Sequence, residues 1–147
     1  MNASLIDKSI TSKYHDLYWK LVKSMKKSGV QIIHRELKSS YGLTYWTENK
    51  ITIESGVAGT LTGLICLLHE RSHLLHQKNG KFSGFYKSKK FTRENHAKLI
   101  WRAEWDCFNY AKNTLKRWGI EANHKLLDKK WAKNNLLEIW IKYYCGE

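Results

Sequence analysis

The stretch Leu61–His76 reads LTGLICLLHERSHLLH, and the rest of the chain is organised around it. Its leucines and isoleucine follow one another so densely that a helix buried on nearly all sides is predicted. The same stretch carries His69, Glu70 and His73 in the order H-E-x-x-H. Ionisable side chains on a buried helix need partners or a metal ion. We therefore expect this helix to supply both core packing and the functional site.

The spacing of the two histidines indicates a zinc site. Positions i and i+4 of an α-helix lie on one face, a single turn apart, so both imidazoles can bind one Zn2+ ion. Glu70 is rotated by about 100° from His69 and can act instead as a general base towards a zinc-bound water. Two ligands, a base and an open coordination position are typical of a hydrolase. The alternative is that both histidines are core residues held by hydrogen bonds.

A third ligand is predicted on a later helix, from about Arg93 to Trp118. The apolar positions of this helix recur at helical spacing through Trp101 and Phe108, and Glu104 falls in the middle of their stripe. A carboxylate in a core-facing stripe is costly unless it is paired or bound to a metal. Glu104 is therefore the expected third ligand, and a buried salt bridge to a lysine or arginine is the alternative.

The remaining pattern predicts an α+β fold. Three short stretches rich in β-branched and aromatic residues, at 30–37, 43–47 and 50–54, are typical of strands. Because Glu48-Asn49 separates the last two as a hairpin turn would, we expect a small antiparallel three-stranded sheet packed on the motif helix.

Further helices are expected before and after this sheet. Helical periodicity indicates one at about 11–27, ending at Gly29, and a last one at about 126–144. Thr60 is the expected N-cap of the motif helix. A chain of 147 residues can bury one core but not two, so a single domain, 1–147, is predicted.

The composition indicates a cytoplasmic protein with anionic partners. The formal net charge is +13, which favours nucleic acid or acidic polypeptides, although a lysine-rich soluble surface is the alternative. The three cysteines, Cys66, Cys107 and Cys145, are too few and too far apart for a disulfide framework, so a reducing compartment is expected. No apolar run reaches the roughly 18 residues of a membrane span, and the N-terminal residues lack the pattern of a signal peptide.

A basic segment between the two long central helices is the expected contact surface. Gly80 and Gly84 indicate a loop, in which lysines and arginine alternate with phenylalanine and tyrosine. This mixture suits a phosphate backbone with stacked bases and suits an acidic polypeptide equally well, while a solvated loop is the alternative. The basic residues are Lys78, Lys81, Lys87, Lys89, Lys90 and Arg93.

With these residues in view, the chain resembles the small gluzincin metallopeptidases, and most of all the ImmA/IrrE-type family. The metal helix of that family commonly reads H-E-L-G-H-L-L-H, which is matched by His69–His76. Its second motif, E-x-E-A-N-x-F-A, is followed by Glu104–Ala111 in its acidic, small, aromatic and alanine positions. The resemblance implies a minimal zincin-like fold, Zn2+ bound by the two motif histidines and Glu104, and Glu70 as general base. It also implies a strand edge that aligns an extended peptide.

The predicted function is therefore zinc-dependent hydrolysis of peptide bonds in a protein or peptide substrate. Tyr45, Tyr110 and His96 are the candidates for stabilising the oxyanion, and the sequence does not choose among them. SprT-like proteases are a neighbouring analogy because they join H-E-x-x-H to strong basic charge, but they use a third histidine, which here would be His96 or His76. A nucleic-acid-binding protein with structural or no zinc is the alternative function.

Arg71 and Ser72 depart from the family pattern, which has an apolar residue and a glycine at these positions. They leave open a third reading, in which the motif is vestigial and the chain is a metal-free interaction module.

Overall fold

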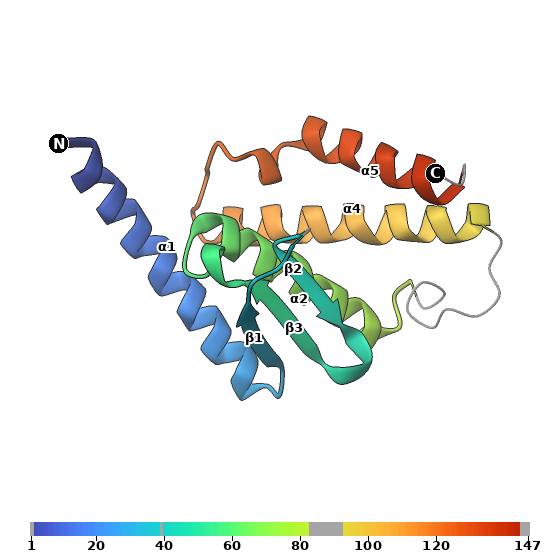
Figure 1. Cartoon of the computed structure of the whole chain (residues 1–147), viewed down its shortest axis with the longest axis horizontal. Helices are drawn as coiled ribbons and strands as arrows, with labels where there is room; N and C mark the ends of the chain where they lie inside the picture. Colours follow the sequence, from blue (N-terminus) through green and yellow to red (C-terminus); the bar gives the residue numbers. More distant parts are fainter. Residues whose placement is uncertain (1, 39, 83–92, 145–147) are drawn as a thin grey trace. The chain divides into compact units, whose positions relative to one another are not determined.

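The structure is a computed structural model that describes residues 2–38, 40–82 and 93–144 (Figure 1). The chain divides into two compact units, Met1–Arg71 and Ser72–Glu147. Each unit is described by itself below. In the described ranges the elements are helical except for one small sheet, so the fold is α+β as predicted. The expectation of a single domain stays a prediction.

The first unit combines a long helix, a three-stranded sheet and the start of the motif helix (Figure 1). Helix α1 begins well before the predicted residue 11, and its end was predicted correctly. The elements, in chain order, are α1 (Asn2–Lys27), β1 (Gln31–Arg35), β2 (Gly42–Tyr45), β3 (Lys50–Glu54) and the first part of α2 (Leu61–Asn79).

The sheet is mixed, with strand order β1-β3-β2. The hairpin is confirmed, because β2 pairs antiparallel with β3 through Tyr45 and Lys50, and Asn49 in the turn has a left-handed φ of 51°. The prediction of a wholly antiparallel sheet was wrong, because β1 runs parallel to β3, with Ile32 opposite Ile51. The connection from β1 to β2 carries the chain past the central position, and β3 then fills that position on its return. Parallel and antiparallel strands share the same alternation of side chains, so the sequence pattern did not distinguish them.

The core of the first unit is formed by apolar side chains from α1, the sheet and α2. Tyr18 of α1 is completely buried, and its hydroxyl oxygen and Nε2 of His34 on β1 are joined by a hydrogen bond of 2.6 Å. Burial, followed by the nearby Cys66, raises the pKa of Tyr18 above its ordinary value, so the hydroxyl keeps its proton. Burial, followed by the charge of Lys26, lowers the pKa of His34. The other buried members are Leu21, Val22, Met25, Ile32, Ile51, Ile53, Leu64, Ile65, Leu67 and Leu68.

The start of α2 depends on two small residues. Thr60 is the N-cap as predicted, since its Oγ1 accepts a hydrogen bond from the Gly63 amide at 3.1 Å and its carbonyl accepts one from Leu64. Gly63 has no room for a side chain, because a Cβ there would lie 2.0 Å from the carbonyl oxygen of Val57. Helix α2 therefore begins in close contact with the 3₁₀-helix Ser55–Val57 that precedes it.

The second unit is built on two helices that run side by side (Figure 1). Helix α4 (Arg93–Arg117) ends at Gly119, whose φ of 75° suits a residue without a side chain. A 3₁₀-helix (Lys125–Leu127) leads into α5 (Lys129–Tyr144), so both predicted helices are present close to their expected bounds. The unit also contains the second part of α2. Its buried residues include Ile100, Ala103, Cys107, Phe108, Ala111, Leu115, Leu127, Ala132 and Leu136.

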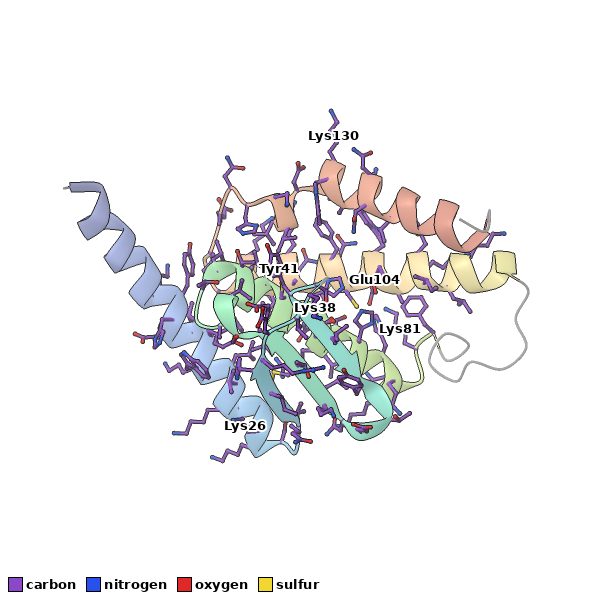
Figure 2. The ribbon with its side chains drawn as sticks, viewed as in Figure 1. Lys26, Lys38, Tyr41, Lys81, Glu104 and Lys130 are labelled. Atoms are coloured by element: carbon purple, nitrogen blue, oxygen red, sulfur yellow. The ribbon has the colours of Figure 1, made fainter. Side chains whose placement is uncertain are left out.

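Most of the predicted basic contact surface lies outside the described residues. Lys78 and Lys81 are exposed at the end of α2 and just beyond it, and Lys81 is marked in Figure 2. Lys87, Lys89 and Lys90, and the side chain of Arg93, are not among the described parts of the chain. Among the helices that are described, none combines the length and the apolar character that crossing a membrane requires.

The Tyr18–His34 pair predicts how stability changes with pH. The folded chain resists protonation of His34, whereas the unfolded chain binds a proton near the ordinary histidine pKa of about 6.5. The stabilisation from neutral His34 is therefore present above that value and is lost as the pH falls through it. We expect the free energy of unfolding to fall more steeply between about pH 7.5 and 5.5 in the wild type than in His34→Gln. Chemical denaturation at each pH measures this difference.

The matched control is His15→Gln, because His15 is an exposed histidine of the same unit. In His15→Gln the free energy of unfolding should fall with decreasing pH as steeply as it does in the wild type. If the free energy of unfolding fell equally steeply with pH in the wild type and in His34→Gln, His34 would not be the source of the pH-dependent stability.

Candidate metal centre

Both motif histidines lie on α2, which is one unbroken helix from Leu61 to Asn79. Three leucines of its first turns are completely buried: Leu64, Leu67 and Leu68. His69 is partly exposed and His73 is buried. The histidines are one helical turn apart, and their potential ligand atoms lie within 4.8 Å of each other. The helix alone therefore brings the two predicted histidine ligands together.

Glu104 lies on α4, where Figure 2 marks it, and its carboxylate contacts His73. Its Oε1 atom lies 3.0 Å from Nε2 of His73, and both side chains belong to the second unit. The His73 side chain is 7% exposed and that of Glu104 is 25% exposed, so the contact is largely shielded from water. The carboxylate placed by helical phase thus lies against the second histidine of the motif.

Cys107 is a third potential donor beside His73, and sequence reasoning had missed it. It follows Glu104 by three residues on α4, is completely buried, and its sulfur lies within 4.8 Å of a ring nitrogen of His73. The spacing of Cys107 from Glu104 could have indicated this, because residues at i and i+3 lie on one face of a helix. In the sequence analysis, Cys107 was considered only for disulfides.

The donors around His73 fit a zinc ion. Imidazole nitrogen, carboxylate oxygen and thiolate sulfur are the ligands that zinc takes in proteins, at roughly 2.0–2.3 Å from the ion. Tetrahedral geometry then separates ligand atoms by on the order of 3.3–3.8 Å. The contact of His73 with Glu104 is 3.0 Å, and the donor atoms of His69, His73 and Cys107 lie within 4.8 Å of one another. Glu104 does not belong to that second group, so its contact with His73 is what connects it to the site.

Glu70 is held in the first unit by strand β2. Its side chain is buried, and its carbonyl oxygen accepts a hydrogen bond from Thr44 Oγ1 at 3.2 Å. Gly42 lies directly over the Glu70 side chain, since a Cβ on Gly42 would be 2.9 Å from Glu70 Cγ. Burial, followed by the charge of Glu70, raises the pKa of Cys66 to about 12, so that cysteine remains a protonated thiol. Among the described residues, the donors that lie together with His73 are His69 and Cys107, and Cys66 is not one of them.

His76 has different surroundings, although it continues the same helix face. Its Nε2 lies 2.5 Å from Oδ2 of Asp106, whose other oxygen is 3.3 Å from the Lys81 ammonium, and its ring packs against Phe82. Burial lowers the pKa of His76 and outweighs the opposing effect of Asp106. Burial would raise the pKa of Asp106, but hydrogen bonds from His76 and Lys81 hold it below its ordinary value. A cation next to the carboxylate makes this a structural pair rather than a metal site.

The candidates for oxyanion stabilisation are only partly located. Tyr45 lies on β2, and its hydroxyl accepts a long hydrogen bond of 3.4 Å from Arg35. Tyr110 is partly buried on α4. His96 also belongs to α4, but its side chain lies outside the described residues. The geometry gives no preference among the three.

Comparison of the chain with protein-family models, with curated proteins and with solved structures found no match in any of the three. The case for the site therefore rests on its own residues.

Proposed function

We propose that this chain is a zinc-dependent peptidase of the gluzincin kind, with a minimal zincin-like fold. The observation that carries the proposal is the 3.0 Å contact of Glu104 on α4 with His73 on α2. It joins the carboxylate expected from helical phase to the H-E-x-x-H motif, although the two are far apart in the sequence. The donor types around His73 support the same conclusion.

In this proposal His69, His73 and Glu104 hold the metal. Zinc bound there would polarise the scissile carbonyl and make an attacking water more acidic. Glu70 does not bind the metal. Its carboxylate accepts the proton of the attacking water and then delivers it to the amine of the departing peptide. The burial of Glu70 under β2 keeps its carboxylate in a shielded setting, where electrostatic interactions with a reacting group are strong.

The substrate proposed for this site is an extended peptide aligned by β2. Strand β2 is at the edge of the described sheet, so its outer side can accept the backbone of another strand. Gly42 and Thr44 of β2 both contact Glu70, which places this edge beside the proposed base. The net charge of +13 favours acidic peptides among such substrates.

Glu70→Gln tests the proposal because it removes the base and keeps the shape of the side chain. We expect zinc content equal to that of the wild type and a cleavage rate lower by roughly 10²–10⁴-fold. The measurement is digestion of a library of unstructured peptides of defined sequence, read by mass spectrometry, beside the zinc content of each protein. Cleavage by Glu70→Gln at the wild-type rate would show that Glu70 is not the base. Exposed Glu36 of the same unit supplies the control, and Glu36→Gln should change neither quantity.

Gly42→Ala tests whether the close passage of β2 positions Glu70. The added methyl group would meet Glu70 Cγ at 2.9 Å and should displace the carboxylate, while the metal ligands are untouched. Because small misplacements of catalytic groups are costly, we expect a loss of about 10- to 100-fold in cleavage at unchanged zinc content.

The control for this variant is Thr47→Ala, in the turn between β2 and β3, where the side chain is exposed. Its cleavage rate should equal that of the wild type. A Gly42→Ala protein with wild-type cleavage would contradict the positioning role of β2.

A further inference from the structure

We infer that Cys107 is a ligand of the metal held by His69 and His73, so that the site includes a thiolate. The inference rests on the proposed metal site and adds a donor outside the predicted ligand set. It also specifies the cofactor more closely, as a divalent transition metal that accepts sulfur.

Helix α4 places Cys107 close to His73. Glu104 and Cys107 occupy neighbouring positions on one face of α4, and each lies against His73. Helix α4 therefore presents two donors to the imidazole, one oxygen and one sulfur. His69 reaches the same imidazole along α2, because its ligand atom and that of His73 are within 4.8 Å.

Cys107 can become a metal ligand only as a thiolate. Cys107 is completely buried, and on binding a divalent metal it loses its proton: the S–H bond breaks, the proton passes to solvent and a sulfur–metal bond forms. Thiolate with imidazole selects ions such as Zn2+ and Co2+ over Mg2+, Ca2+ and Mn2+.

Ligation by Cys107 is compatible with the proposed reaction. Two imidazoles, the Glu104 carboxylate and the Cys107 thiolate would complete a tetrahedral shell, which is typical of a closed site. With one of the two α4 donors released, three ligands remain and one position is open to the reaction.

The experiment uses Co2+ as a spectroscopic probe in the whole protein. Bound Co2+ absorbs in the visible range, and a thiolate ligand adds a charge-transfer band in the near ultraviolet. We expect the wild type to show both bands, and Cys107→Ser to keep the visible bands and lose the ultraviolet band. Cys66→Ser is the matched control and should keep both, because Cys66 is not among the described donors that lie together with His69 and His73.

The outcomes separate this inference from the proposed function. Two results would overturn ligation by Cys107 but leave the metal site itself supported. One is a wild type that shows the visible bands without the ultraviolet band, and the other is an ultraviolet band that persists in Cys107→Ser. A wild type that binds neither Co2+ nor Zn2+ would overturn both. If Cys107→Ser does not fold, X-ray absorption of the zinc-loaded wild type decides. Sulfur at about 2.3 Å supports the inference, and a shell of nitrogen and oxygen alone contradicts it.

Discussion

The contact between Nε2 of His73 and Oε1 of Glu104 is the interaction on which the candidate metal centre depends. Both groups have given up most of their contact with water, and each would be costly to bury without the other or without a metal. Cys107 lies next to His73 because it shares a face of α4 with Glu104.

A second histidine–carboxylate pair in the same unit shows why the type of neighbouring donor matters. His76 and Asp106 are also in contact, but the groups around them are the Lys81 ammonium and the Phe82 ring. Those neighbours satisfy a carboxylate and cover an imidazole without supplying more ligands. Around His73 the neighbours are another imidazole and a thiol. The two pairs therefore have different surroundings, although each has a histidine from α2 and an acid from α4.

Residues without bulky side chains allow the motif helix to lie close to the rest of the first unit. Gly63 permits α2 to start against the carbonyl of Val57, and Gly42 permits β2 to pass over Glu70. The same strand anchors the helix backbone through Thr44. These contacts connect the edge of the sheet to the proposed catalytic base. They give a physical reason for treating β2 as the part of the unit that would meet a substrate.

Features that depend on neighbouring residues could be predicted from the sequence. The Thr60 cap, the hairpin around Asn49, the end of α4 near Gly119 and the placement of Glu104 follow from local turn chemistry and helical phase. The parallel pairing of β1 could not, because strand direction depends on the path of the connection and not on the alternation of side chains.

The position of Cys107 could be predicted only in part from the sequence. Its position on the face of Glu104 could be calculated from the helix repeat, but its nearness to His73 depends on how the helices of the second unit pack. The predicted ligand set of His69, His73 and Glu104 remains a prediction, to which the structure adds a fourth candidate.

Whether the chain holds a metal at His69, His73 and Glu104 can be decided from the zinc content and zinc affinity of the purified protein, determined by mass spectrometry with chelator competition. The wild type, Glu104→Ala and the exposed control Glu121→Ala would be compared. We predict about one zinc per chain in the wild type and in the control, and clearly weaker binding in Glu104→Ala, since that variant loses one of the ligands. A wild type without zinc, or a Glu104→Ala protein with unchanged affinity, would contradict the account.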